Sequence, residues 1–206
     1  MKAYSRQAPL TIVCYGDSNT KYYLGDLQQD GPEELSYPHR LQQLFLQNGF
    51  SNVRVLNCGF PDTRTDFALE HFTNQVTDNH ADICILGFGT NCINKPAPQL
   101  APYLRDMEQL FARCYENGVQ PMCLLLPWFS EDYCGIEGQQ LLPRWNSALA
   151  GLCMEHHVPL LDTYSSFYGQ PERFFNEKQT PRRHYSPAAT DMIAELAYAM
   201  IAPCLR

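Results

Sequence analysis

The sequence predicts an α/β fold, a three-layer α/β/α sandwich in which one five-stranded parallel sheet is covered by helices on both faces. Two observations lead to this prediction. Five short apolar runs follow one another along the chain, and longer stretches with apolar residues at helical spacing separate them. The runs are apolar almost throughout, as expected of parallel strands that are buried on both faces.

The five predicted strands are rich in Val, Ile, Leu and Cys. They are LTIVCY (10–15), VRVLN (53–57), DICILGF (82–88), PMCLLL (121–126) and VPLLD (158–162). Their shortness favours strands over helices. In sheets of this kind, ligands bind beyond the carboxyl ends of the strands, so the residues that follow these runs are expected to lie together.

Four longer helices are predicted from apolar spacing and from their end signals. The first begins after residues 37–38, and the second ends at 117–118. The third runs from about 139 to 157, and the fourth from about 186 to 201. A Tyr-Pro pair and a Ser-Pro pair mark two of the starts, because Pro is favoured in the first helical turn. An Asn-Gly pair marks one of the ends.

Composition limits the class of protein. The chain has 206 residues, 45% of them hydrophobic, and no linker-like stretch, which predicts a single domain spanning 1–206. The formal net charge of −7 argues against a nucleic-acid surface or an anionic-membrane surface. No run approaches the ~18–20 apolar residues of a membrane span.

Nine cysteines are present, without a C-x-x-C pair or Cys/His spacing typical of zinc, so no metal site is predicted. Cys14, Cys84 and Cys123 fall within predicted strands, where a free thiol behaves as a small apolar side chain. The apolar run 10–15 is too short for a secretory signal and ends in a turn. These features predict a cytoplasmic protein with reduced thiols.

Polar residues follow three of the predicted strands and precede the last helix. Ser18 lies in GDSNT (16–20), Gly59 in NCG, Asn91 in GFGTN, and His184 just before the last helix. Acyl transfer uses such a set, because a serine hydroxyl needs a neighbouring imidazole to accept its proton. The resulting oxyanion needs donors such as a backbone amide and a carboxamide.

Each of these residues has a structural alternative. Gly-Asp-Ser is a common turn composition, Gly89 and Asn91 suit a tight turn after a strand, and His184 alone is compatible with a surface histidine. Their joint occurrence, in order and at matching strand ends, favours the catalytic interpretation.

These blocks resemble those of the SGNH hydrolase superfamily, also called GDSL esterases and lipases, whose marker residues are Ser, Gly, Asn and His. The matching segments are IVCYGDSNT (12–20), NCG (57–59), GTN (89–91) and HYSPAA (184–189), together with the Tyr-Pro helix start in SYPHRLQQLF (36–45). The wording CYGDSNT is similar to the arylesterase-like branch. The resemblance spans nearly the whole chain and implies the flavodoxin-like SGNH hydrolase fold.

The resemblance also implies roles for single residues. Ser18 would be the nucleophile and His184 the base, with the oxyanion held by the Ser18 and Gly59 amides and the Asn91 side chain. Asp17 would brace the nucleophile turn through hydrogen bonds. The implied substrate is a small-molecule ester (a carbohydrate acetyl, short-chain or aryl ester), and no metal or organic cofactor is expected.

Three departures from the family pattern concern the neighbours of these residues. Phe60-Pro61-Asp62 replaces the continuation to a second glycine, and Cys92 replaces an Asp. Pro181 occupies the usual position of the triad Asp, three residues before the histidine. Glu177 and Asp162 are candidates for a relocated acid, each with a structural alternative (a polar loop and a turn cap, respectively). A Ser–His dyad is favoured over relocation.

Two other functions compete with the esterase. A non-catalytic SGNH-fold binding protein would have lost the acid and the reaction while keeping the pocket. A nucleotide-binding Rossmann or flavodoxin-like domain is indicated only weakly, by Gly87-Phe88-Gly89. The aromatic residues of segment 128–138, with Tyr22 and Tyr23, are expected either to line an acyl, aryl or sugar site or to close the core.

Overall fold

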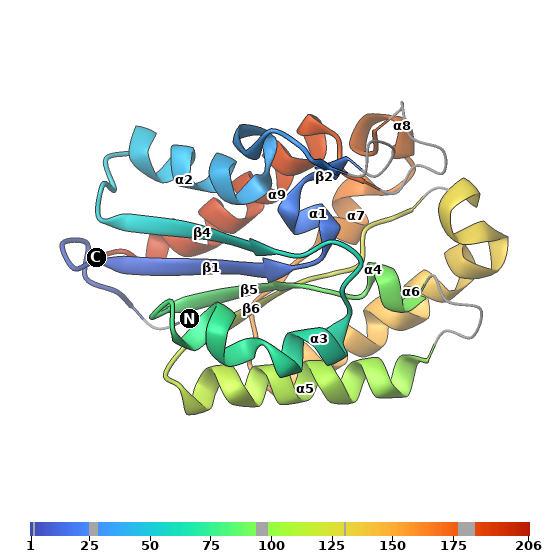
Figure 1. Ribbon diagram of the computed structural model, residues 1–206, viewed down its shortest axis with the longest axis horizontal. Helices are drawn as coiled ribbons and strands as arrows, with labels where there is room; N and C mark the ends of the chain where they lie inside the picture. Colours follow the sequence, from blue (N-terminus) through green and yellow to red (C-terminus); the bar gives the residue numbers. More distant parts are fainter. Residues whose placement is uncertain (2, 25–28, 94–98, 130, 177–183) are drawn as a thin grey trace.

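A central sheet of five parallel strands organises the protein. The computed structural model describes residues 1, 3–24, 29–93, 99–129, 131–176 and 184–206. The strand order is β4-β1-β5-β6-β7 (Figure 1). The strands are β1 (Leu10–Gly16), β4 (Val53–Gly59), β5 (Ile83–Gly87), β6 (Gln120–Leu124) and β7 (Leu160–Leu161). The five predicted strands are thus confirmed.

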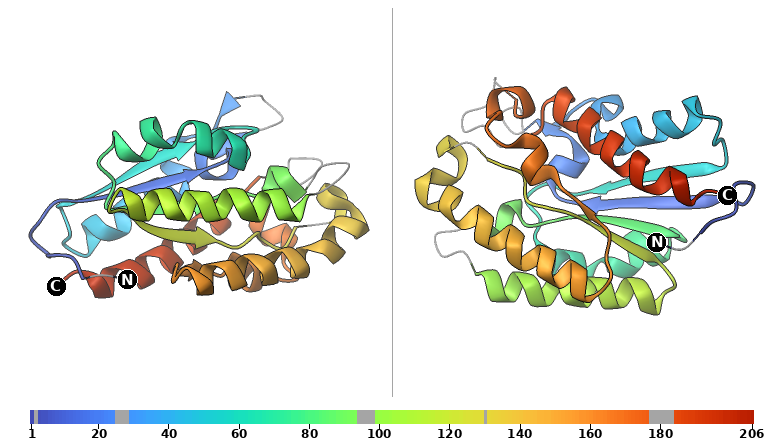
Figure 2. Two further views of the ribbon diagram at one scale, coloured as in Figure 1. Left: turned by 90° about the horizontal axis from the view of Figure 1, so that it is seen from below. Right: turned by 180° about the vertical axis from the view of Figure 1, so that it is seen from behind.

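Helices cover both faces of the sheet, which confirms the predicted three-layer sandwich (Figures 1 and 2). On one face α2 (Tyr37–Gln47) and α9 (Pro187–Ile201) pack against each other. On the opposite face α5 (Leu100–Glu116) contacts both α3 (Thr65–Glu70) and α6 (Glu131–Glu155).

Shorter elements complete the described chain. The short α-helices are α1 (Ser18–Lys21), α4 (Thr90–Ile93), α7 (Thr163–Phe167) and α8 (Pro171–Phe174). A small antiparallel pair consists of β2 (Tyr23–Leu24) and β3 (Gln29–Asp30). Single turns of other helix types span Glu33–Leu35, Thr73–Thr77 and Ala202–Cys204. The four short α-helices all lie toward the carboxyl ends of the central strands (Figure 1).

Strand β1 lies at the point where the chain switches faces. Its two neighbours are β4, reached from β1 through α2 on one face, and β5, reached from β4 through α3 on the other. The chain leaves β1 toward β4 and leaves β5 in the opposite direction, toward β6, so the carboxyl ends of β1 and β5 form the switch point at which open α/β sheets bind ligands. The segment that leaves this end begins with Asp17 and Ser18.

Glycines bring α1 close to the end of the sheet. Gly16 in β1 pairs in register with Gly59 in β4 and Gly87 in β5. A Cβ on Gly59 would lie 2.2 Å from the Lys21 nitrogen, and one on Gly16 would lie 2.1 Å from Thr20 Oγ1. Only glycine therefore lets α1 pack directly onto these strand ends.

The structure differs from the sequence predictions in two places. The fifth strand is confined to Leu160–Leu161 of the predicted 158–162, at the edge of the sheet, where it pairs with β6 alone. The span of α6 begins at Glu131, before the predicted start near Gln139, but it is not one continuous helix. Gly135 is non-helical, with a φ of 67° and a ψ of 171°, and separates a short helical turn at Glu131 from the long helix that follows it.

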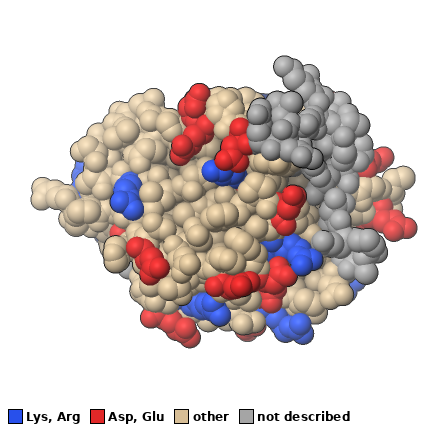
Figure 3. Space-filling model, in the orientation of Figure 1, with Lys and Arg blue, Asp and Glu red and all other residues tan. Residues whose placement is uncertain are grey.

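The surface carries charges of both signs, and the cysteines are free thiols. Acidic and basic side chains are interspersed over the described part of the face in Figure 3. Among the described helices, none is long and apolar enough to cross a bilayer. All nine cysteines are free thiols, and Cys14, Cys84 and Cys123 are buried in strands, as predicted. Burial raises the pKa of Cys58 to about 11, so that thiol stays protonated at neutral pH.

Candidate active site

The serine lies in a tight turn between β1 and α1. Asp17 caps this helix: its Oδ1 accepts a hydrogen bond from the Asn19 backbone N–H at 2.9 Å, and its own N–H donates to the Gly87 carbonyl at 3.3 Å. Ser18 is the first helical residue and is buried. Through Asp17, the turn that carries Ser18 is thus fixed both to its own helix and to β5.

Asp17 is buried with little charge compensation. Desolvation by burial raises the pKa of its carboxyl from 3.8 to about 7, although hydrogen bonds from Asn19 and Thr90 act in the opposite direction. The carboxyl therefore changes charge near neutral pH, directly beside the serine.

His184 comes from the other end of the chain to meet this turn. Its Nε2 lies 3.1 Å from Ser18 Oγ, and both side chains are buried. This distance is within hydrogen-bond reach, as a nucleophile and its general base require. The structure therefore brings together two residues that are 166 positions apart in the sequence.

The segment that carries His184 is held by a short antiparallel bridge between Phe175 and Tyr185. The His184 carbonyl accepts from Asn176 N–H at 2.9 Å, and Ser186 N–H donates to the Phe174 carbonyl at 3.0 Å. Ser186 then caps α9 through its hydroxyl, which accepts from the Ala189 N–H, confirming the predicted start of the last helix.

Asn91 and Gly59, the predicted oxyanion donors, both have partners within the protein. Asn91 Nδ2 donates to the Thr63 carbonyl at 2.9 Å, which uses one of its two amide hydrogens. The Gly59 N–H donates to its own chain, to Asn57 Oδ1 at 3.1 Å. Asn91 thus retains a hydrogen for a substrate, whereas Gly59 would have to exchange its partner.

Of the two candidate acids, the structure describes only Asp162. Glu177 lies outside the described residues, as does Pro181. Asp162 caps α7, and its Oδ1 accepts from the Ser165 N–H at 2.9 Å. This is the structural alternative that the sequence offered for Asp162.

Of the two tyrosines expected near the site, Tyr22 lies in the core and Tyr23 lies against His184. Tyr22 is buried and ends α1 with a φ of 65°, in the left-handed region. The half-buried Tyr23 meets the His184 ring edge to face, with centroids 5.9 Å apart. Farther along the same edge of the sheet, Trp128 contacts the exposed Tyr168 in the same manner, at 5.5 Å.

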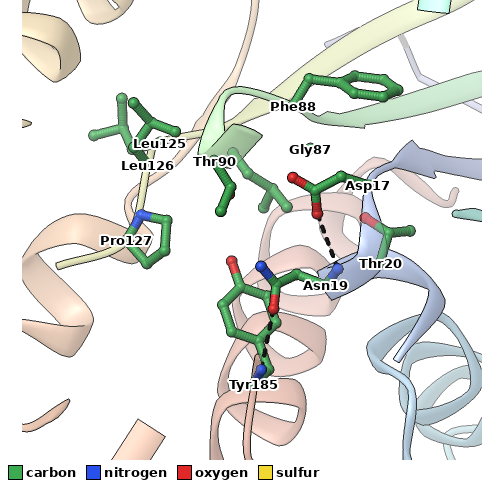
Figure 4. A pocket seen from close by; sticks show the side chains of 11 residues that line it. Asp17, Asn19, Thr20, Gly87, Phe88, Thr90, Leu125, Leu126, Pro127 and Tyr185 are labelled. Atoms are coloured by element: carbon green, nitrogen blue, oxygen red, sulfur yellow. Dashed lines mark hydrogen bonds between the residues drawn. The ribbon is translucent and has the colours of Figure 1, made fainter. Parts of the chain in front are cut away.

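A small cavity lies beside the turn that carries Ser18 and has room for about one water molecule. Residues that line it include Asp17, Asn19, Thr90, Pro127 and Tyr185 (Figure 4). An open pocket lies elsewhere on the loop after β4 and on α3, and it includes Thr63, whose carbonyl Asn91 holds. Within the described part of the chain, no group of three His, Cys, Asp or Glu side chains is arranged to hold a metal ion.

Sequence reasoning missed the supporting contacts of this site. Asn19 lies in GDSNT, Thr90 lies in GTN, and Tyr185 follows His184 directly, but the sequence predicted no role for any of them. Asp62 was noted only as a replacement for a family glycine, and the structure shows that it has a φ of 58°. A glycine would adopt this left-handed conformation without strain. The departure from the family's glycine in Phe60-Pro61-Asp62 is therefore the sequence feature that could have drawn attention to Asp62.

One family of known proteins matches most of the chain. A model of the GDSL-like lipase/acylhydrolase family matches residues 14–191. A comparison with curated protein sequences gave no match.

Solved structures show the same fold at low sequence identity. A lipase/acylhydrolase from Enterococcus faecalis has a TM-score of 0.79 at 18% identity, over 96% of this chain and 97% of that one. An acetyl xylan esterase from Geobacillus stearothermophilus has a TM-score of 0.75 at 14% identity, over 94% and 95%. An α/β hydrolase from the metagenome of Lake Arreo has a TM-score of 0.76 at 18% identity, over 98% and 100%.

Proposed function

The chain belongs to the GDSL-like lipase/acylhydrolase family and is a carboxylic ester hydrolase, and we propose that it works through an acyl-enzyme on Ser18. The observation that carries the proposal is the 3.1 Å distance between Ser18 Oγ and His184 Nε2. Both side chains are buried, and they lie at the carboxyl edge of the sheet, at its switch point.

In the first half-reaction, His184 Nε2 accepts the proton of Ser18 as Oγ attacks the acyl carbon. The tetrahedral oxyanion collapses, the bond to the alcohol breaks, and His184 returns the proton to the departing alkoxide. Water then attacks the acyl carbon and gives a proton to His184. The bond between the acyl carbon and Oγ breaks, His184 returns that proton to Ser18 Oγ, and the carboxylic acid leaves.

The oxyanion is held by the Ser18 and Gly59 amides and by the Asn91 side chain. Ser18 N–H belongs to the first turn of α1, where amides have no partner inside the helix. Asn91 supplies its second Nδ2 hydrogen while the first stays on the Thr63 carbonyl. Gly59 contributes only when Asn57 Oδ1 releases its N–H, so we assign the larger share to Ser18 and Asn91.

A Ser–His dyad performs this chemistry without Asp162, whose carboxylate caps α7. Loss of the orienting acid costs about 10⁴ in turnover in the serine protease template, but much of the catalysis remains. A carboxylate at Glu177 is the alternative. The predicted alternative function, a non-catalytic binding protein, is supported only by Pro181 at the usual position of the acid.

We propose small acyl groups on carbohydrate, short-chain or aryl alcohols as substrates. Tyr23 beside His184, and Trp128 with Tyr168 on the same edge, supply aromatic surfaces suited to a sugar ring or an aryl group. The similarity to acetyl xylan esterases favours the sugar acetates. The nine free thiols support a reducing location such as the cytoplasm.

The test is hydrolysis of p-nitrophenyl acetate and butyrate by the wild type, Ser18→Ala and His184→Ala, with Ser51→Ala as control. Ser51 is exposed and lies outside the site. We expect both dyad variants to lose at least about 10³ in kcat/KM and the control to keep its activity. Equal activity in all four proteins would refute Ser18 as the nucleophile and favour the binding protein. Acetylated xylo-oligosaccharides then test the sugar substrates.

A further inference from the structure

Asn19 joins the serine turn to the histidine segment beside the dyad itself. Its side-chain Oδ1 accepts a hydrogen bond from the Tyr185 backbone N–H at 3.0 Å. Ser18 and Asn19 are consecutive residues, and so are His184 and Tyr185. Two hydrogen bonds therefore link the same two segments side by side, one between reacting groups and one between their neighbours (Figure 4 shows the second).

Contacts other than the hydrogen bond to Tyr185 also hold Asn19 in place. Its backbone N–H donates to Asp17 Oδ1, and the residue is 3% exposed within the first turn of α1. The orientation of the carboxamide is unambiguous, because a backbone N–H must face the oxygen and not the nitrogen. Its Nδ2 points into the small cavity between Thr90 and Tyr185 (Figure 4).

The Tyr185 N–H depends on this contact. Tyr185 is buried, with 5% of its surface exposed, so removing the Asn19 oxygen would leave a desolvated donor unsatisfied. The segment would then shift to recover a partner, and His184 is the next residue. A displacement of about 1 Å in a catalytic group costs on the order of 10²-fold in rate.

We propose that Asn19 is a positioning residue that holds His184 at hydrogen-bonding distance from Ser18 by accepting the Tyr185 N–H. The proposal rests on the proposed function for its kinetic consequence. Asn19 supplies, from the nucleophile side, an orienting contact to the base segment in a chain that has Pro181 where the family acid stands.

Two variants of similar size separate the effect of the Asn19 side-chain oxygen from the effect of its packing. Asn19→Leu removes the acceptor, and Asn19→Asp keeps an acceptor oxygen in either ionisation state. We expect Asn19→Leu to lower kcat for p-nitrophenyl acetate by about 10- to 100-fold with KM within about twofold. Asn19→Asp should stay within about fivefold of the wild type. Wild-type kcat in Asn19→Leu would overturn the proposal.

The matched control is Gln42→Leu. Gln42 also braces a backbone with its amide, accepting from Val55 N–H at 2.8 Å and donating to the Val53 carbonyl at 2.9 Å, but at the opposite end of β4. We expect it to lose stability while keeping kcat. An equal fall of kcat in both Leu variants would show a general packing effect and overturn the specific role of Asn19.

Amide hydrogen exchange tests the contact without using activity. We expect faster exchange at Tyr185 in Asn19→Leu, near wild-type exchange in Asn19→Asp, and no change in Gln42→Leu. Unchanged Tyr185 exchange in Asn19→Leu refutes the brace even if the esterase is real. Faster exchange, with Ser18→Ala as active as the wild type, supports the brace and refutes the proposed function. Should Asn19→Leu not fold, the smaller Asn19→Ala takes its place in both measurements.

Discussion

The proposed nucleophile and the proposed base of this site are held by two different kinds of structure. Ser18 follows a central strand and begins a helix packed onto glycines at the strand ends, so regular structure fixes it from several sides. His184 stands on an irregular segment fixed by a two-residue bridge to Phe175 and by the Asn19 side chain. Regular structure thus places the serine, whereas the described contacts that place the histidine are individual hydrogen bonds and ring contacts.

This difference matters for how the site tolerates change. Perturbing the serine side means disturbing the sheet and the helix above it, and the whole domain should lose stability. Perturbing one hydrogen bond on the histidine side should lower activity before it lowers stability, because such a bond acts on the position of the His184 ring and not on the sheet. The following variants separate these two outcomes, beginning with the largest expected effect.

Gly59→Ala attacks the serine side. The new Cβ would lie 2.2 Å from the Lys21 nitrogen and 2.7 Å from the Thr20 carbonyl carbon, which are backbone atoms that cannot rotate away. We expect a loss of about 3 kcal/mol in the free energy of unfolding, measured with urea, and a loss of esterase activity as α1 is displaced.

Gly151→Ala is the control for this substitution. A Cβ at Gly151 in α6 meets nothing within 4 Å, and alanine is favoured over glycine in a helix by about 0.5–1 kcal/mol. It should therefore stabilise the protein slightly. If Gly59→Ala were as stable and as active as Gly151→Ala, the close approach of α1 to β4 would not matter.

Asp17→Asn sharpens the comparison through pH. Burial raises the folded-state pKa of Asp17 to about 7, so the folded protein holds this proton more tightly than the unfolded chain. The associated stability is present below the unfolded pKa and is lost as pH rises through about 7. We expect the wild type to lose about 2.5 kcal/mol between pH 5 and pH 8 relative to Asp17→Asn.

Urea unfolding of both proteins at pH 5 and pH 8 measures this difference. Other titrating groups are shared by the two proteins and cancel in the comparison. Asn at position 17 keeps an oxygen acceptor for the Asn19 N–H, so the cap should survive. Parallel pH dependences would mean that the Asp17 carboxyl is ionised in the folded state over this whole range.

The same contrast explains what the sequence predicted. The strands and the serine turn rest on local signals, apolar runs and a short motif, and these were predicted close to where they lie. The hydrogen bond between Asn19 and Tyr185 joins residues 166 positions apart through a backbone N–H, which leaves no trace in residue type. The short helical turn before Gly135 was not predicted, because the non-helical Gly135 separates it from the long helix that carries the apolar spacing.

Asp162→Ala makes the smallest expected change and tests how the histidine is oriented. Its carboxylate accepts from the Ser165 N–H at the start of α7, so alanine should cost about 1 kcal/mol of stability through loss of the cap. If backbone contacts and Asn19 orient His184, kcat for p-nitrophenyl acetate should stay within about twofold of the wild type.

Asp162→Asn is the matched control, because the carboxamide oxygen can still cap α7 while the charge is gone. We expect it to match the wild type in both stability and kcat. A carboxylate that orients His184 would give a different result, since both variants would then lose activity on the scale of about 10⁴ seen when a triad acid is neutralised. Glu177→Gln, assayed beside them, completes the comparison. A loss of that size in Glu177→Gln alone would assign the acid to Glu177. Retention of activity in all three variants would leave a dyad whose base is oriented by the hydrogen bonds that Asn19 and the backbone make to the His184 segment.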